Sequence, residues 1–283
     1  MYENKTDDLI LATLAADTYC LGSHWVYDPA ELKNLKIDWA ELNAPSVAWH
    51  EGKKLGYFTH YGDQIKILLA YLEKNPGMFD ISKYINYWKD EITSITTYMD
   101  GATKETIENL SENKTVPCGS NAHDMAAVGR SFALLKVSQT KEEFLSNTAI
   151  FVKATHDNAE VLEATHFFSS LLLATLEGAD IVATMGTLKG NYSQNIQTYI
   201  QSGLDSKGAD TEETLQRFGT HCGVEVGMSG VVHLLCKHDK YEEALIANAH
   251  CGGDSSSRAM IIGAILIAKG DKSQIPLRWQ KYL

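Results

Sequence analysis

Apolar residues recur at helical spacing along nearly the whole chain. Within residues 65–72 they fall at i, i+3, i+4 and i+7, which is the spacing of one face of an α-helix. Residues 158–176 are similarly apolar and lie just before Gly178. Residues 259–268 are apolar on nearly every side, which predicts a buried central helix. Because alternating strand patterns are almost absent, we predict an all-α fold of about ten helices.

The chain shows no fixed-period repeat and no Pro/Ser-rich linker, so we treat residues 1–283 as one domain. Residues 36–61 contain tryptophans, His50 and several glycines, and they predict a long, aromatic-rich connection. Loops of that length are more often functional than idle. Residues 202–213 are small and polar, and they predict a second surface loop.

The charge balance excludes one class of partner. The chain has 25 basic and 36 acidic side chains, a net charge of −11, so little in it would neutralise a run of phosphates.

The longest nearly apolar stretch, residues 259–268, is far shorter than the roughly 20 residues that a membrane span needs. The five cysteines are scattered without a CxxC pair, which is typical of free thiols in a reducing cytoplasm. We therefore expect a cytoplasmic protein that binds neither nucleic acid nor membrane.

Residues 252–258 read Gly-Gly-Asp-Ser-Ser-Ser-Arg and directly precede the predicted buried helix. Gly252 and Gly253 permit a close backbone approach, and Asp254 with the serines places oxygen atoms around the unpaired N–H groups of a helix start. Such a segment can hold a metal ion or a sugar hydroxyl. In the alternative interpretation, Asp254 is only a helix N-cap, which is worth about 1 kcal/mol.

Two more segments place acids and histidines at helix starts. Asp63, within residues 59–64, opens the helix of residues 65–72 and either caps it or contacts a ligand. Asp157 stands three residues before Glu160, which is capping-box spacing. His156 has no such local role, so it is free to contact a ligand or to orient a carboxylate.

Two loops complete the set of candidates. Residues 118–124, which include Asn121 and Asp124, form a Gly/Ser/Asn loop, for which a solvated turn is the alternative. Residues 22–29 gather His24, Tyr27 and a tryptophan in the pattern of a pocket wall that stacks on a planar or sugar ligand. The alternative for that loop is a packed aromatic corner that ends at Asp-Pro. No P-loop, GxSxG, HExxH or dinucleotide motif is present, and the cysteines lack a nucleophile signature.

Taken together, these segments resemble the ADP-ribosylglycohydrolase family, and more closely its crystallin J1-like branch. The resemblance covers nearly the whole chain. Each motif alone is weak, but their occurrence in the order of the family is fairly specific. The motifs lie at residues 9–28, 59–64, 100–103, 120–121, 155–157, 252–258 and 275–279.

The resemblance implies an all-α fold with a cleft in which two magnesium ions meet an ADP-ribosyl group. At the family's metal-binding positions this chain keeps Asp63, Asp254 and the hydroxyl of Ser257, whereas Gly62 and Ser256 replace two carboxylates. Magnesium prefers oxygen ligands in a near-octahedral array. With two carboxylates lost, we expect one magnesium ion or none.

The family's Gly-Asp-Ala-Leu-Gly signature is also altered, since its Asp position falls on Tyr19, with Asp17 nearby. The resemblance implies a hydrolase that cleaves an ADP-ribosyl or related N- or O-ribosyl bond, with a water held by carboxylates. The catalytic residues that we expect are Asp63, Asp254 and His156, and the metal ligands are Asp63, Asp254 and Ser257. The expected substrate contacts are His24, Tyr27, Asn121, Asp124, Gly252 and Gly253.

Two other hypotheses remain open at this point. The chain can be a crystallin J1-like ligand-binding or structural protein that kept the fold and lost the metal chemistry. It can also hydrolyse a different glycosidic or amide bond without metal, because a fold does not determine a function. The expected partner is a small-molecule or ADP-ribosylated substrate. The sequence determines neither the acceptor group nor the oligomeric state.

Overall fold

The computed structural model describes residues 2–283, and within this range it contains helices and no β-sheet. The prediction of an all-α fold is therefore confirmed. The helices outnumber the ten or so expected because several, such as α2 (Pro29–Asn34) and α15 (Leu277–Gln280), are only one or two turns long. The other α-helices are α1 (Glu3–Cys20), α3 (His60–Lys74), α4 (Ile81–Ser94), α5 (Gly101–Ser111), α6 (Ala126–Ser131), α7 (Lys141–Thr155), α8 (Ala159–Leu176), α9 (Ile181–Leu188), α10 (Gln194–Asp205), α11 (Thr211–Phe218), α12 (Val224–Lys237), α13 (Tyr241–His250) and α14 (Ser255–Lys269). Short 3₁₀ helices lie at Ala48–His50 (η1), Phe132–Lys136 (η2), Lys189–Asn191 (η3) and Lys272–Gln274 (η4).

Helix α14 lies at the centre of the molecule. Every residue of the helix from 255 to 268 is buried. The helix packs against α1, α6, α8, α12 and α13. Gly263 permits the close packing of α1 on α14, because a Cβ at this position would already lie 3.2 Å from the carbonyl oxygen of Ala12. The prediction of a buried helix at residues 259–268 is confirmed.

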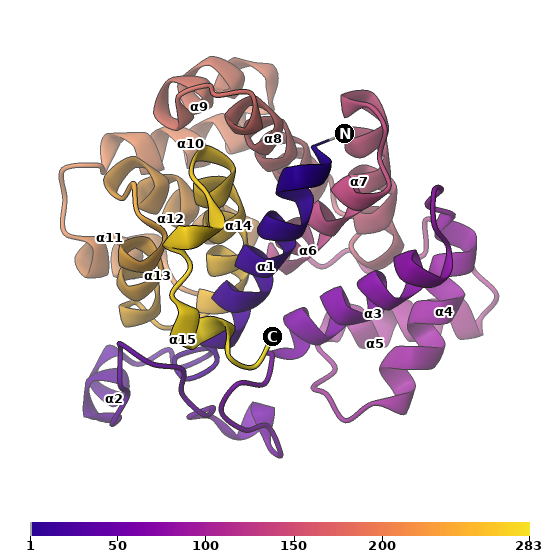
Figure 1. Ribbon diagram of the computed structural model, residues 1–283, viewed down its shortest axis with the longest axis horizontal. Coiled ribbons are helices and arrows are strands. Elements are labelled where there is room, and N and C mark those ends of the chain that lie inside the picture. Colours follow the sequence, from indigo (N-terminus) through magenta and orange to yellow (C-terminus); the bar gives the residue numbers. More distant parts are fainter. Residues whose placement is uncertain (1) are drawn as a thin grey trace.

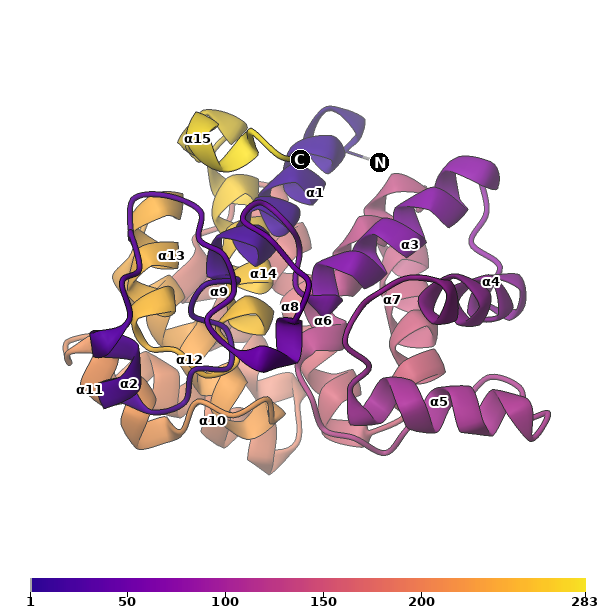
Figure 2. The same cartoon turned by 90° about the horizontal axis from the view of Figure 1, so that it is seen from below.

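The remaining helices surround α1 and α14 (Figure 1). Helices α3, α4 and α5 form a group on one side of α1, and α11, α12 and α13 lie on the other side. The segment between α1 and α3 contains α2 and η1 and is otherwise irregular. It runs across the side of the molecule that faces the viewer in Figure 2. The long connection predicted at residues 36–61 is therefore present.

The start of α3, the end of α1 and the start of α14 meet at one point. The carboxylate of Asp17, in the last turn of α1, accepts hydrogen bonds from Thr59, just before α3, and from Ser256, in the first turn of α14. The first N–H groups of a helix have no partner within the helix. The junction therefore brings polar backbone and polar side chains together inside an apolar fold.

The structure corrects our expectations for three helix starts. Thr59 caps α3, because its hydroxyl accepts from the N–H of Tyr61, so Asp63 is not the cap. Asn158 caps α8, and Asp157 does not. Asp254 occupies the N-cap position of α14, but its side chain makes no capping hydrogen bond. The carboxylates of Asp63 and Asp254 are therefore committed to other contacts.

The prediction of a loop at residues 202–213 is wrong at both ends. Helix α10 continues to Asp205, because Gly203 packs against Val232 of α12. Helix α11 already begins at Thr211, where the Asp210 carboxylate caps it by accepting from the N–H of Glu213. The small, polar composition of this segment reflects close helix packing and capping as well as exposure to solvent.

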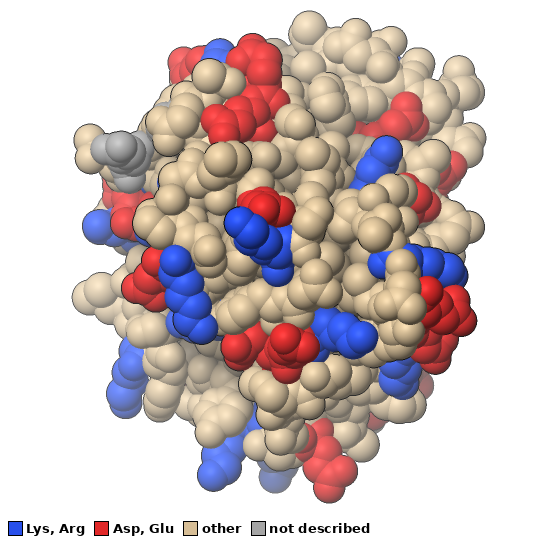
Figure 3. Space-filling model, turned by 90° about the vertical axis from the view of Figure 1, so that its right-hand side faces the viewer, with Lys and Arg blue, Asp and Glu red and all other residues tan. Residues whose placement is uncertain are grey.

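The surface carries both signs of charge. On the face shown in Figure 3, Lys and Arg side chains lie among Asp and Glu side chains, without a broad area of one sign. Across residues 2–283, no helix combines the length and the apolar character needed to cross a membrane.

Candidate functional site

Three buried histidines lie together at the junction of α1, α3 and α14. His24 follows α1, His50 ends η1, and His60 is the first residue of α3. Each offers one candidate ligand nitrogen, and these three atoms lie within 4.8 Å of one another. All three side chains are at most 2% exposed. Burial lowers the pKa of His24 and of His50, the latter to about 3, with further lowering from the neighbouring His60.

Asp254 borders this histidine cluster. Its Oδ1 atom accepts a hydrogen bond from the hydroxyl of Tyr61 over 3.1 Å, and its Oδ2 atom accepts from Ser257 Oγ over 2.5 Å. His24 Nδ1 lies 3.7 Å from Asp254 Oδ1. Burial raises the pKa of Asp254, against the opposing effect of the Ser257 hydrogen bond. Three of the predicted site residues, Asp254, His24 and Ser257, therefore lie together.

A second buried carboxylate, Asp17, stands beside the cluster, and sequence reasoning gave it no role. Its Oδ1 atom accepts from Thr59 Oγ1 over 2.5 Å and from Ser256 Oγ, and its Oδ2 atom accepts from Thr59 N over 2.9 Å. A Cβ added at Gly62 would overlap Asp17 Oδ2. The Asp17 carboxylate therefore fills the space next to Gly62, a position at which the resemblance implies a carboxylate. Burial raises the pKa of Asp17.

Asp63 does not contact Asp254. Its Oδ2 atom accepts from Thr97 Oγ1 over 2.5 Å and forms an ion pair with Lys53. On a helix, residues two positions apart do not face the same way, so Asp63 and Tyr61 leave α3 in different directions. Among the described residues, none of the hydrogen bonds or ion pairs joins Asp63 to Asp254. The catalytic and metal-binding roles of Asp63 stay predictions.

A second group of predicted residues gathers around His156. His156 Nε2 lies 3.9 Å from Asp124 Oδ2, and Nδ1 lies 3.0 Å from Thr155 Oγ1. The isolated β-bridge between Ser120 and His156 holds the 118–124 loop against the end of α7. Burial and, to a smaller extent, the charge of Arg130 lower the pKa of His156 to about 4. Asp124 is partly exposed, so this group faces solvent.

Asp100 and Tyr61 connect the two groups. His60 Nε2 lies 3.4 Å from Asp100 Oδ2. Burial raises the pKa of Asp100, but the neighbouring His60, together with His156 and the N–H of Thr103, outweighs this and holds the pKa below its usual range. Burial raises the pKa of the Tyr61 hydroxyl well above its ordinary value, and the charges of Asp254, Asp100 and Asp124 raise it further. The buried Tyr61 hydroxyl therefore donates to Asp254 and lies within the electrostatic influence of Asp124, which belongs to the His156 group.

The remaining predicted substrate contacts lie at the edges of this arrangement. Tyr27 is 46% exposed, and burial of the rest of the ring beside Asp254 raises the pKa of its hydroxyl. Asn121 is exposed, and its Oδ1 atom and carbonyl oxygen accept from the side-chain amide of Asn158 over 3.3 and 3.2 Å. Their contacts with a substrate stay predictions.

Gly252 and Gly253 have left-handed backbone conformations, with φ of 60° and 59°. A Cβ at Gly252 would overlap the carbonyl oxygen of Val26, and one at Gly253 would overlap that of Thr220. Gly253 N donates to Val26 O over 2.8 Å, and Asp254 N donates to Thr220 O over 2.8 Å. The glycines therefore allow close approach of the backbone of Val26 and Thr220, not of a ligand. These backbone contacts fix the position of Asp254 at the start of α14.

The donor atoms do not fit the magnesium site that the resemblance implied. Magnesium requires several oxygen ligands around one point. Here Asp17 and Asp254 are engaged by hydroxyl groups, and Asp63 is paired with Lys53. Within residues 2–283, the one group of three or more His, Cys, Asp or Glu side chains with gathered ligand atoms is the histidine cluster. Its nitrogen donors suit a softer metal than magnesium.

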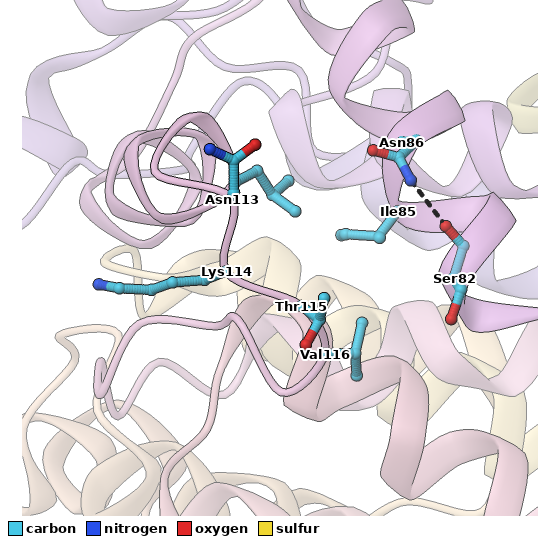
Figure 4. Close-up of a pocket in the computed structure, with 8 residues that line it drawn as sticks. Ser82, Ile85, Asn86, Asn113, Lys114, Thr115 and Val116 are labelled. Atoms are coloured by element: carbon cyan, nitrogen blue, oxygen red, sulfur yellow. Dashed lines mark hydrogen bonds between the residues drawn. The ribbon is translucent and has the colours of Figure 1, made fainter.

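Sequence reasoning missed His50, His60 and Tyr61 as site residues. His50 and His60 stand in the 36–61 connection and at the start of α3, with no short-range spacing that links them to His24. A surface pocket of about 240 Å³ lies elsewhere, between α4 and the segment that follows α5. Figure 4 shows its lining, which includes Ser82, Asn86 and Lys114 and shares no residue with the site.

The helical fold and this polar junction define a class of protein, and the comparisons identify it. The chain belongs to the ADP-ribosylglycohydrolase family, whose model matches residues 2–283. It is similar to crystallin J1A and crystallin J1B of Tripedalia cystophora, with 21% and 20% identity, and each match covers 98% of this chain and 91% of the relative. Its fold is similar to that of a solved ADP-ribosylglycohydrolase-related protein complex, with a TM-score of 0.73 and 15% identity over 98% of this chain and 92% of the other.

Proposed function

We propose that the protein is a hydrolase that cleaves an ADP-ribosyl or related N- or O-ribosyl bond, with Asp254 holding the attacking water. The observation that carries this proposal is the environment of Asp254. Its carboxylate is buried, its pKa is raised, and Tyr61, Ser257 and His24 surround it. A carboxylate with a raised pKa is a better proton acceptor, which is what a general base requires.

The group around His156 supplies the opposite side of the proposed pocket. At neutral pH the His156 ring is uncharged, because its pKa is about 4. It therefore acts as a hydrogen-bonding group toward a ribose hydroxyl or the leaving group, while the partly exposed Asp124 accepts a hydrogen bond from a ribose hydroxyl. Tyr27 offers an exposed aromatic ring at the solvent side, on which a planar base can stack.

The proposal contains no step through magnesium, because the carboxylates that the family uses are absent or engaged elsewhere. The predicted magnesium stoichiometry, one ion or none, is tested directly by calorimetry with magnesium alone. The substrate that we propose is a small molecule or an ADP-ribosylated residue rather than nucleic acid, in keeping with the net charge of −11. All five cysteines are free thiols, which supports a reducing compartment such as the cytoplasm.

The test is the release of free ADP-ribose from a panel of ADP-ribosylated arginine and serine peptides. We expect Asp254→Asn to lower the rate by at least about 100-fold, because general-base catalysis contributes about that much. The control is Asp7→Asn, which changes an exposed carboxylate that is paired with Lys136. We expect this control to retain the wild-type rate. Equal background release by the wild type and by Asp254→Asn contradicts the proposal.

A second candidate function has its own support. Both crystallin relatives match over nearly the full chain, and this chain has Gly62 and Ser256 where the resemblance to the family implies carboxylates. In this alternative the protein keeps the fold as a structural or ligand-binding protein. Calorimetry with ADP-ribose separates the functions, since a purely structural protein releases no heat, and a ligand-binding protein releases heat without turnover.

A further inference from the structure

The histidine cluster has a property that the proposed hydrolysis does not use. Within it, His24 Nε2 and both ring nitrogens of His50 and of His60 are buried without a hydrogen-bond partner. The ring centroids are 5.3 Å apart for His24 and His50, 5.7 Å for His50 and His60, and 6.0 Å for His24 and His60. The centroid of each ring therefore lies within 6.0 Å of the centroids of the other two.

Buried polar atoms without partners are rare, because each one costs about 1–3 kcal/mol. One unpartnered histidine indicates little by itself. Three unpartnered histidines that converge on one point are explained more simply by one common ligand than by three unrelated causes. A ligand that accepts lone pairs from all three rings at once is a metal ion. No other described group of His, Cys, Asp or Glu side chains converges in this way.

The type of donor selects the type of metal. Three neutral imidazoles suit zinc and its neighbours among the transition metals, whereas magnesium and calcium prefer oxygen. In a tetrahedral zinc site with Zn–N bonds of about 2.0–2.1 Å, the nitrogen atoms are about 3.4 Å apart. The ligand atoms here lie within 4.8 Å of one another, so a small inward movement of the rings completes the site.

In two of the three rings, a carboxylate oxygen lies near one ring nitrogen and leaves the other nitrogen available to a metal. Asp100 Oδ2 lies 3.4 Å from His60 Nε2, which leaves His60 Nδ1 as the ligand atom. Asp254 Oδ1 lies 3.7 Å from His24 Nδ1, which leaves Nε2 as the ligand atom. Metal-binding histidines usually donate their second ring N–H to such an acceptor. Without metal, His24 Nδ1 accepts from Ser256 N over 3.4 Å, so a metal on Nε2 moves the ring proton to face Asp254.

We propose that His24, His50 and His60 bind one divalent transition-metal ion of the zinc class. Three protein ligands leave a fourth position for water in a tetrahedral site. The proposal concerns binding and does not depend on hydrolysis of a ribosyl bond. It also predicts that the metal joins the turn after α1, which holds His24, to the 36–61 connection, which holds His50 and enters α3 at His60.

The test is a titration of the untagged, chelator-treated protein with cobalt(II), monitored by the visible absorption bands of tetrahedral cobalt. Zinc is then added as a competitor. Elemental analysis of the purified protein measures the metal that it carries before chelator treatment. We expect one equivalent of cobalt to bind and zinc to displace it. We expect His50→Gln and His60→Gln each to weaken binding by about 100-fold, and Asp100→Asn to weaken it by about 10-fold. Circular dichroism of each variant verifies that it remains folded.

The control is His221→Gln. His221 and His123 lie near Glu225, at 3.6 and 3.9 Å, and form an exposed group that can collect metal adventitiously. We expect this variant to bind cobalt as the wild type does. The proposal is overturned if the folded wild type shows no tetrahedral bands at millimolar cobalt, or if His221→Gln rather than His50→Gln abolishes them. Since the wild-type titration alone decides the first point, a misfolded variant does not rescue the proposal.

Discussion

Replacing Gly62 by alanine adds one methyl group where the Asp17 carboxylate already lies. The new Cβ would overlap Asp17 Oδ2 and would lie 2.7 Å from Phe58 Cβ, so the surrounding structure must shift. Overpacking of this kind costs about 1–3 kcal/mol. Alanine in a helix regains about 0.5–1 kcal/mol relative to glycine. We therefore expect Gly62→Ala to lower the free energy of unfolding by about 1–2 kcal/mol.

A double-mutant cycle with Asp17→Ala isolates the contact between the two positions. In the Asp17→Ala background, the overlap with the carboxylate is absent and only the approach to Phe58 remains. We expect Gly62→Ala to cost at least about 1 kcal/mol less in that background than in the wild type. Asp17→Ala alone is destabilising, because the donors of Thr59 and Ser256 lose their acceptor.

Urea unfolding, followed by circular dichroism, measures all four proteins of this cycle. The result that would refute the reasoning is additivity within about 0.5 kcal/mol, since sites without a shared contact behave that way. Additivity would mean that the Asp17 carboxylate does not occupy the space beside Gly62. The explanation of why this chain has glycine there would then fail.

Two further predictions concern the site. The folded-state pKa of His156 is about 4, below the value near 6.5 of an unfolded chain, so the unfolded state binds more protons and wild-type stability falls as pH drops from 6.5. His156→Gln should lose about 1.5 kcal/mol less stability than the wild type between pH 6.5 and 5 in urea titrations, and equal losses would contradict the buried neutral ring. Gly253→Ala should cost more than about 2 kcal/mol and impair ADP-ribose release, because its φ of 59° and the Thr220 carbonyl exclude a Cβ. Its control is Gly186→Ala in α9, where a Cβ meets nothing within 4 Å and stability should not fall.

The sequence predicted the parts of the fold that depend on local periodicity. The apolar character of residues 259–268 identified the central helix, because burial on all sides leaves no polar face. The end of α10 was missed because Gly203 and its small neighbours resemble a loop when read alone. Their packing against Val232 involves a partner about 30 positions away, and local composition does not report it.

The candidate site was predictable only in part. Asp254, His24 and Ser257 were found through the family motifs, and the structure brings these three together. His50 and His60 were missed because their approach to His24 depends on the path of an irregular connection. The contacts of Asp63 depend on the direction in which its side chain leaves α3, which the motif does not specify. Tyr61, two residues earlier, makes the contact to Asp254.

The most direct test of the proposed function is a crystal structure of the protein with ADP-ribose and magnesium. We expect the anomeric carbon of the ribose to lie within reach of a water held by Asp254, about 3–3.5 Å from that water, with His156 and Asp124 facing the ribose hydroxyls. We expect no magnesium ion bridging Asp63 and Asp254. ADP-ribose bound away from Asp254, or a magnesium ion held jointly by those two carboxylates, would contradict the account.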